Sequence, residues 1–454
     1  MRVNGSLEIR LLDALISSPC GFMTRHLPVK SSLFQSNRDR LRGLLPEKSL
    51  VVVNANDIPP TNADAVMIPV PNSDLFYLTG VAQEESVLVI CPDAHEEKHR
   101  EILFLRETSE HIAVWEGFKL TKEQARATSG VRTVMWLQEF PVMMRRLMCE
   151  SDHVFLNSNE HARADIVVES REARFVRETV AMWPLHRYHR LAKLMHELRP
   201  VKSEEEIALL KEACRITGDG FRRLLGFVRP GVHEFEVEAE LAHEFIRQRG
   251  RFAYNPIIAS GNNANVLHYL DNNAVCKKGD VLLLDVASTY ANYNADLTRT
   301  IPVSGKFTKR QREVYDAVLR VLRGCIKNLV PGKLPKDWQR EAEELMQVEL
   351  LKLGLITEKD IKKQDPEKPA LKKYFMHGVG HPLGLDVHDV AAIGAPFAAG
   401  WVMTVEPGIY IPDEGFGIRL ENDVLITADG TVDLMADIPI EAAEIESLMK
   451  KARG

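Results

Sequence analysis

The segment that most constrains this chain is residues 281–300, VLLLDVASTYANYNADLTRT. Two β-forming runs enclose a short polar centre, a pattern that predicts a hairpin. A turn centred between Tyr290 and Ala291 places Asp285 directly opposite Asp296. Directly opposed residues have Cβ atoms about 5 Å apart, and like charges there are destabilising. The hairpin therefore either binds a cation between its two carboxylates or carries two unrelated acidic residues at its strand ends.

Composition indicates an ordinary globular protein. The 454 residues are enough for two or three domains, and 45% of them are apolar and 27% charged. A net charge of −6 gives no electrostatic reason to bind nucleic acid or an anionic membrane. No apolar run approaches the roughly 20 residues that span a bilayer. We therefore expect neither nucleic acid nor a membrane as a partner.

The cysteines and the N-terminus bear on location. The six cysteines are scattered and contain no C-x-x-C pair, which favours reduced thiols in a cytoplasm-like compartment. Residues 1–35 read as an extension of unknown role, and their basic and serine content leaves an organelle-targeting peptide open. The expectation is a cytoplasmic protein whose mature form either includes or lacks this extension.

Two domains are predicted after the extension. Residues 36–190 alternate strands and helices, which is typical of a compact α/β domain, and they contain no nucleotide-binding glycine motif. Residues 174–198 are basic and predict a solvated, largely helical linker interrupted at Pro184. In residues 191–454, a capping box from Ser203 to Glu206 starts a long helix. There strands mix with helices without regular βαβ alternation, and a charged loop near 359–369 precedes a further strand, so this domain is predicted to be α+β.

A glycine-rich segment at residues 377–388, HGVGHPLGLDVH, carries three histidines. Its glycines and proline make a helix unfavourable and let the backbone approach a neighbouring group closely. Any one of these histidines could equally be a structural residue, but three within twelve residues favour a site.

Two further carboxylates join the set. Glu406 ends an apolar run, where a carboxylate needs a partner. Alternation puts Arg419 and Glu421 on one strand face, as site residues or as a surface ion pair. A hairpin centred between Asp413 and Glu414 would place Glu406 opposite Glu421. Two such hairpins plus one imidazole would form a cup that two divalent cations neutralise. Oxygen-rich ligands favour Mn²⁺ or Mg²⁺, and a metal pair activates water and polarises a carbonyl for hydrolysis.

With these motifs in hand, the chain resembles the pita-bread metallopeptidases and, within them, the Xaa-Pro aminopeptidases (aminopeptidase P). The resemblance covers residues 36–450. It rests on NSDLFYLTG (72–80), SGNNANVLHY (260–269), the 281–300 segment, FMHGVGHPLGLDVHD (375–389), VMTVEPGIYI (402–411) and GIRLEND (417–423). It implies a pita-bread catalytic domain behind an α/β N-terminal domain that restricts access and helps to set a homo-oligomer, either a dimer or a tetramer.

The resemblance also implies roles for individual residues. Two divalent metal ions, most consistent with Mn²⁺, would be bound by Asp285, Asp296, His381, Glu406 and Glu421, with Asp296 and Glu421 shared between the ions. A hydroxide held by both ions would attack the carbonyl before proline, and Glu406 would carry a proton to the leaving nitrogen. His268, His377 and His388 would act on the substrate side, as catalytic or proline-pocket residues, and Arg419 would orient Glu421 or contact the product side.

Several alternatives stay open at this point. A prolidase would share the fold and metals but cleave only Xaa-Pro dipeptides, and a non-catalytic pita-bread domain would bind peptides or proteins. Methionine aminopeptidase fits less well because that activity usually goes with a shorter chain, and a structural Ca²⁺ site would not need the histidines. Pro382 and Trp401 depart from the family pattern and put the substrate-length preference in doubt.

Overall fold

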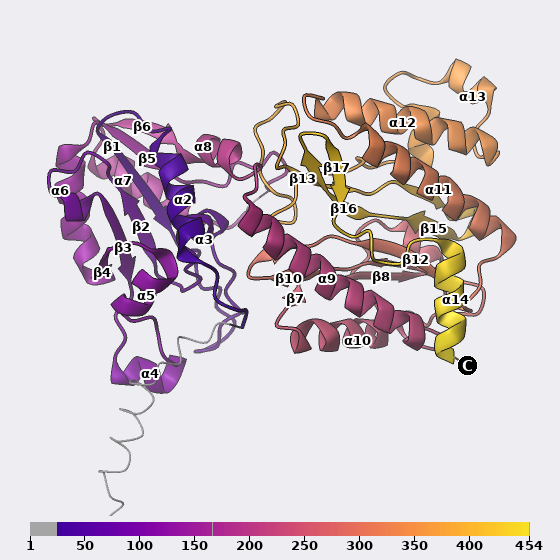
Figure 1. The fold of residues 1–454 in the computed structure, drawn as a ribbon, viewed down its shortest axis with the longest axis horizontal. Coiled ribbons are helices and arrows are strands. Elements are labelled where there is room, and N and C mark those ends of the chain that lie inside the picture. The colour runs from indigo at the N-terminus through magenta and orange to yellow at the C-terminus, as the bar shows by residue number, and fades with distance from the viewer. Residues whose placement is uncertain (1–24, 166, 454) are drawn as a thin grey trace, which may run out of the picture. The chain divides into compact units, whose positions relative to one another are not determined.

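The computed structural model describes residues 25–165 and 167–453, which divide into two compact units between Leu194 and Met195 (Figure 1). Each unit is described by itself below. Of the N-terminal extension considered above, residues 1–24 lie outside the described residues. Residues from Ser31 onward form a helix, α2 (Ser31–Arg42). No helix of the described residues is both long and apolar enough to cross a membrane.

The first unit is built on one six-stranded sheet in the order β4-β3-β2-β1-β5-β6. Its strands are β1 (Ser49–Asn54), β2 (Val87–Ile90), β3 (Glu101–Leu105), β4 (Thr133–Trp136), β5 (His153–Leu156) and β6 (Arg187–Arg190), and its helices besides α2 are α3 (Ser73–Thr79), α4 (Glu110–Glu116), α5 (Lys122–Ser129), α6 (Phe140–Glu150) and α7 (Arg171–Met182). The apolar faces of the strands pack with α6 in one core that includes Val52, Phe104 and Leu147. The predicted α/β domain is thus a mixed sheet covered by helices.

Residues 174–198 are helical on both sides of an interruption that includes Pro184, as predicted, but they contain a sheet strand and are not a solvated linker. After α7 the chain forms the edge strand β6 and then a short helix, α8 (Leu191–Leu198). Strand β6 pairs in parallel with β5, and the His189 ring stacks on Phe155 with centroids 4.7 Å apart. Such cross-strand contacts stabilise a strand that its local sequence does not predict.

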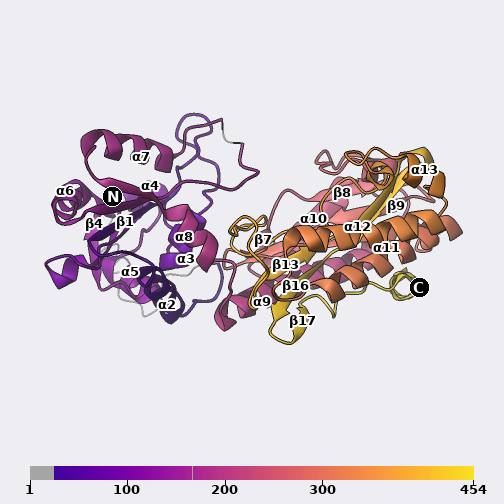
Figure 2. The ribbon, with the colours of Figure 1, turned by 90° about the horizontal axis from the view of Figure 1, so that it is seen from above.

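The second unit combines long helices with several small sheets (Figure 2). The helices are α9 (Glu204–Phe227), α10 (Glu234–Arg247), α11 (Lys309–Asn328), α12 (Pro335–Lys352), α13 (Glu358–Lys363) and α14 (Ala442–Arg453). The strands are β7 (Arg251–Phe252), β8 (Ile257–Ser260), β9 (Val281–Asp285), β10 (Ser288–Tyr290), β11 (Tyr293–Asn294), β12 (Thr298–Pro302), β13 (Val402–Val405), β14 (Gly408–Ile411), β15 (Phe416–Arg419), β16 (Asn422–Thr427) and β17 (Gly430–Asp433). Helices α9 and α10 pack together, as do α11 and α12, and the α+β prediction is confirmed.

Local signals predicted some boundaries of this unit and missed others. The capping box at the start of α9 is present, with the Ser203 hydroxyl accepting from the Glu206 amide and the Glu206 carboxylate accepting from the Ser203 amide. The charged loop near 359–369 instead begins with α13, which Thr357 caps. The strand expected next is absent from residues 374–401, all of which the structure describes, because this glycine-rich stretch forms only an isolated bridge between Pro382 and Met403.

The first carboxylate hairpin is shifted by two residues from its predicted register. Asp285 pairs with Thr298 instead of Asp296. The turn consists of Ala291 and Asn292, with φ of 49° and 65°, so it lies one residue further along the chain. Two positive φ values are the mark of a turn whose twist matches a hairpin. Because side chains alternate with period two, this slip leaves the same strand faces paired.

The second carboxylate hairpin has the predicted register. Val405 pairs with Asn422 in β13–β16, and Gly408 pairs with Arg419 in β14–β15. Both pairs belong to one register, which places Glu406 opposite Glu421 in the break between the two ladders. The two hairpins therefore deliver four carboxylates to one region of the second unit.

Candidate metal centre

Five predicted donors converge in the second unit, each from the end of a strand or from a loop beside one. Asp285 ends β9 and Asp296 lies between β11 and β12. Glu406 lies between β13 and β14, and Glu421 between β15 and β16. His381 comes from the glycine-rich loop before β13. Strand ends suit this task because the ladder fixes the backbone while the side chain is free to leave the sheet.

Distances within the cluster are short. One donor atom from each of Asp296, His381 and Glu421 lies within 4.8 Å of the other two. His381 Nε2 is 3.6 Å from Asp296 Oδ2 and 3.8 Å from Glu406 Oε1. Asp296 is 5% exposed and Glu421 2% exposed, so these two carboxylates are almost shielded from water.

The carboxylates of this cluster repel one another electrostatically. Burial, followed by the charge of Asp285, raises the pKa of Asp296 well above its ordinary value. Burial, followed by the charge of Asp296, does the same for the pKa of Glu421. Buried carboxylates need a compensating positive charge. Four carboxylates and one imidazole are a donor set that fits divalent cations, with oxygen donors dominating.

Tyr254 joins the first two carboxylates and was missed from the sequence. Its hydroxyl lies 2.6 Å from Asp285 Oδ1 and 2.7 Å from Asp296 Oδ1. Burial and then the charge of Asp285 raise the pKa of Tyr254 well above its ordinary value, so the hydroxyl keeps its proton and can donate. A lone tyrosine has no motif spacing by which a sequence could have revealed it.

A second group missed from the sequence supports Asp296 through its backbone. The Asp423 carboxylate accepts from the Asp296 amide at 3.0 Å and from the Cys214 thiol at 3.4 Å. Asp423 is fully buried. It therefore fixes the backbone position of Asp296 just after β11.

Neighbouring groups fix the position and orientation of the His381 imidazole. Its Nδ1 lies 3.0 Å from the Pro382 carbonyl, which can only accept, so Nδ1 donates there while Nε2 faces the carboxylates. The His381 amide donates to Thr404 Oγ1, and the Thr404 amide donates to the His381 carbonyl. A Cβ at Gly380 would lie 2.0 Å from the Thr404 carbonyl oxygen, so only glycine allows the loop to approach β13 this closely.

Arg419 reaches both hairpins. Its Nη2 lies 2.6 Å from Asp285 Oδ2, and its Nε donates to Thr298 Oγ1 at 3.1 Å. The Thr298 hydroxyl in turn donates to Glu421 Oε2 at 2.7 Å. Arg419 therefore pairs directly with Asp285 and acts on Glu421 only through Thr298. It is 4% exposed, which excludes the surface ion pair considered from the sequence.

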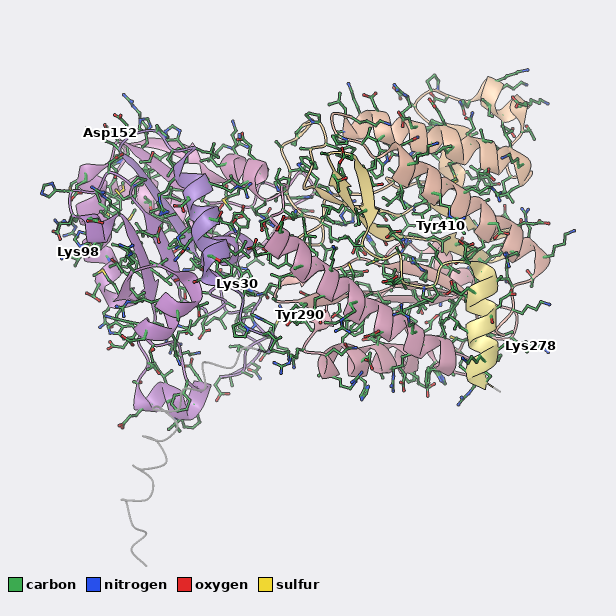
Figure 3. The ribbon with its side chains drawn as sticks, viewed as in Figure 1. Lys30, Lys98, Asp152, Lys278, Tyr290 and Tyr410 are labelled. Atoms are coloured by element: carbon green, nitrogen blue, oxygen red, sulfur yellow. The ribbon has the colours of Figure 1, made fainter. Side chains whose placement is uncertain are left out.

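His377 uses both ring nitrogens within the chain. Nδ1 donates to the Gly378 carbonyl at 2.7 Å, and Nε2 accepts from the hydroxyl of Tyr410, which is labelled in Figure 3, at 2.8 Å. Arg419 Nη1 donates to the same hydroxyl at 2.8 Å. Burial and then Arg419 lower the pKa of His377 to about 4, so the ring is neutral at pH 7.

The other two predicted histidines are exposed. The His388 ring packs edge-to-face on His381, with centroids 4.2 Å apart. His268 follows the short helix η3 (Gly261–Asn265), and no hydrogen bond, ion pair or ring contact of the described residues joins it to the five donors. Of the two residues that depart from the family pattern, Trp401 is 6% exposed and packs on Phe397. It therefore belongs to the core of the second unit.

Comparison with known proteins agrees with this geometry. Residues 208–428 match metallopeptidase family M24, and residues 34–155 match the aminopeptidase P N-terminal domain. The Xaa-Pro aminopeptidase of Escherichia coli is 35% identical over 442 residues, covering 92% of this chain and 98% of that protein. Xaa-Pro aminopeptidase 3 of Homo sapiens is 32% identical, covering 88% of this chain and 79% of that protein.

Solved structures lead to the same group. Zinc-substituted E. coli aminopeptidase P in complex with product superposes with a TM-score of 0.83 at 33% identity, covering 94% of this chain and 100% of that one. By fold and donor set, the second unit is the catalytic domain of a metal-dependent hydrolase. The chain belongs to metallopeptidase family M24, among its aminopeptidase P members.

Proposed function

We propose that this chain is an Xaa-Pro aminopeptidase, which releases the N-terminal residue from peptides with proline at the second position. The observation that carries the proposal is the convergence of Asp296, His381 and Glu421 in a buried cluster, with Asp285 and Glu406 beside them. The relatives named above, which share this activity by name, support it.

These five residues would bind two divalent cations, and the oxygen-rich donor set favours Mn²⁺. When bound, such ions activate a water molecule and polarise the carbonyl of the scissile bond. His381 directs its Nε2 toward the cluster because its Nδ1 is bonded to the Pro382 carbonyl, and Nε2 is proposed as its metal donor. Asp296 and Glu421, the most buried of the carboxylates, are proposed as the donors shared by both ions.

Cleavage before proline requires a proton for the leaving nitrogen, because an acylated prolyl nitrogen has no hydrogen of its own. Glu406 is proposed to deliver it, since its side chain is 22% exposed and its Oε1 lies 3.8 Å from His381 Nε2. His268 and His388 are exposed and are proposed to contact the peptide. His377 is proposed to act through Tyr410 and Arg419, because both of its nitrogens are used within the chain.

The test is hydrolysis by Mn²⁺-loaded protein of three peptides: Xaa-Pro-Xaa, Xaa-Pro and Xaa-Ala-Xaa. Cleavage of the first, abolished by Glu406→Gln, is the expected result. Cleavage of the dipeptide alone would move the assignment to a prolidase. If none of the peptides is cleaved although metal is bound, the alternative of a non-catalytic peptide-binding domain would be favoured.

We further propose a homo-oligomer, a dimer or a tetramer, and a cytoplasmic location. Helix α4 has no buried residue. Its Val114 and Trp115 are 79% and 72% exposed, and the nearby Phe118 is 55% exposed. Apolar groups exposed together favour a protein partner, here a second copy. Light scattering of Trp115→Ala should report a smaller particle than wild type.

The five cysteines of the described residues are unpaired thiols, which supports the proposed cytoplasmic location in a reducing compartment. Cell fractionation tests this location.

A further inference from the structure

The loop that carries His388 is held by charged side chains that no part of the proposed mechanism uses. Asp389, the next residue, is 2% exposed. Its Oδ2 accepts from Lys202 Nζ at 2.9 Å, and its Oδ1 pairs with Arg199 Nη2. Arg199 also pairs with Asp386 at 2.7 Å. Two cations from the segment before α9 thus bind the far end of a loop almost 190 residues away in sequence.

Asp389, Arg199 and Lys202 form a buried cluster of charged side chains. The side chains of Lys202 and Asp389 are each 1% exposed, and that of Arg199 is 3% exposed. The Val390 amide donates to Asp389 Oδ1 at 2.9 Å. Burial acts to raise the pKa of Asp389, but Arg199 and Lys202 outweigh it and hold the pKa below its ordinary value. Asp389 is therefore ionised at neutral pH, and the cluster has geometry that a buried ion pair requires.

The loop between the two histidines is closed on itself and tied to the first hairpin. The Asp389 amide donates to the Pro382 carbonyl at 2.9 Å, and the Leu383 amide donates to Val402. Asn294 Nδ2 donates to the carbonyls of Gly384 and Leu385 at 3.1 and 2.9 Å. Asn294 lies two residues before the predicted ligand Asp296, so one hairpin holds both the cluster and the loop.

A glycine makes room for the carboxylate. A Cβ at Gly384 would lie 2.1 Å from Asp389 Oδ2 and 3.0 Å from Lys202 Nζ. Any other residue at position 384 would push the Asp389 carboxylate away from Lys202. The close approach of these groups is thus built into the backbone of the loop.

From these contacts we infer that Asp389, clamped by Arg199 and Lys202, is a positioning residue that sets His388 beside His381 for contact with the peptide. His388 is exposed and has its ring against His381. Asp389 follows it directly in the chain, so the clamp on Asp389 fixes the backbone that carries the His388 ring. His381 has its own support in Thr404. Loss of the clamp therefore moves His388 and leaves the metal donors in place. This inference rests on the proposed function.

A double-mutant cycle tests it. We measure kcat and KM for an Xaa-Pro-Xaa peptide with Asp389→Asn, His388→Ala and the double variant, each with its metal content. Each single variant is expected to lose roughly 10-fold to 100-fold in kcat/KM, the cost of a misplacement near 1 Å. The double variant is expected to lose no more than His388→Ala, with metal content unchanged. Independent, multiplying losses would overturn the inference, because Asp389 would then act through something other than His388.

Two further variants keep the result interpretable. Lys202→Met keeps the Arg199–Asp389 pair and takes the place of Asp389→Asn in the cycle if that variant does not fold. Glu349→Gln breaks a different ion pair, between the buried Glu349 and the exposed Arg320, and should leave kcat/KM unchanged. If wild-type protein cleaves no Xaa-Pro peptide, the proposed function fails. A crystal structure of Asp389→Asn then decides the inference, since a displaced His388 ring supports it and an unmoved ring overturns it.

Discussion

Tyr254 is the residue whose hydroxyl ties the first two carboxylates of the cluster together. Replacing it with phenylalanine removes the hydrogen bonds to Asp285 and Asp296 while keeping the ring. Groups that orient metal ligands typically cost about 10–100-fold in metal affinity when mutated. Tyr254→Phe should therefore weaken Mn²⁺ binding by that order, as measured by isothermal titration calorimetry. Tyr315→Phe, which removes a tyrosine hydroxyl bonded to the Ile440 carbonyl away from the five donors, is the control and should bind Mn²⁺ as wild type does.

His377 should stay neutral across the physiological pH range. Its pKa is lowered from 6.5 to about 4, so the unfolded chain binds a proton there between pH 6.5 and 4 that the folded chain does not. This residue's contribution to stability is therefore complete above pH 6.5 and is lost as the pH falls toward 4. Long-range ¹H–¹⁵N spectra should show its ring neutral from pH 5 to 8. A titration midpoint near 6.5 would contradict the hydrogen bonds assigned here.

Residue-level prediction from the sequence succeeded where types and spacing were informative. Asp285 and Glu406 were found because each ends an apolar run, and Asp296 because it comes just before a β-forming run. Glu421 was found because alternation places it on one strand face with Arg419. Tyr254 was not, since a single tyrosine carries no pattern. The Arg199–Asp389 pair was out of reach for a different reason: its members are about 190 residues apart and only the folded chain brings them together.

At the scale of elements, the glycine-rich loop and β13 are packed backbone to backbone. An alanine at Gly380 would place its Cβ 2.0 Å from the Thr404 carbonyl, and neither group can move without separating His381 from Thr404. Overpacking of this kind costs about 1–3 kcal/mol. The melting temperature of the catalytic unit should fall by about 2–4 °C for each kcal/mol.

Gly378→Ala is the control for this prediction, because its Cβ would meet only Gln339 Oε1 at 3.8 Å. It should melt within a degree or two of wild type (~0.5 kcal/mol). Equal melting temperatures for both alanine variants would show that the close approach at Gly380 does not constrain the loop.

The two hairpins show what limits element prediction. Glu406 and Glu421 were paired correctly because two unbroken ladders on either side share one register. Asp285 was paired two residues off because the turn uses Ala291 and Asn292 in left-handed conformations, without the Asn-Gly or Asp-Gly signal that marks such turns. Strand β6 was missed because it depends on pairing with β5.

At the scale of the whole molecule, metal should stabilise one unit and not the other. All five proposed donors lie in the second unit, residues 195–453 of the described chain. A ligand that binds only the folded state stabilises it by about 2.7 kcal/mol at 100 times its Kd. In calorimetry, adding Mn²⁺ to chelated protein should raise the midpoint temperature of the second unit's unfolding transition and leave that of the first unit unchanged. A shift of neither transition would show that Mn²⁺ does not bind the folded second unit. A shift of the first unit's transition alone would place the metal in that unit.

The decisive experiment is a titration of Mn²⁺ into chelated protein, following bound metal and cleavage of an Xaa-Pro-Xaa peptide together. We expect two ions per chain, with activity appearing as they bind, and loss of activity in Asp296→Asn because that residue is proposed to be shared by both ions. Full activity in chelated protein, or in an Asp296→Asn variant that binds no metal, would contradict it.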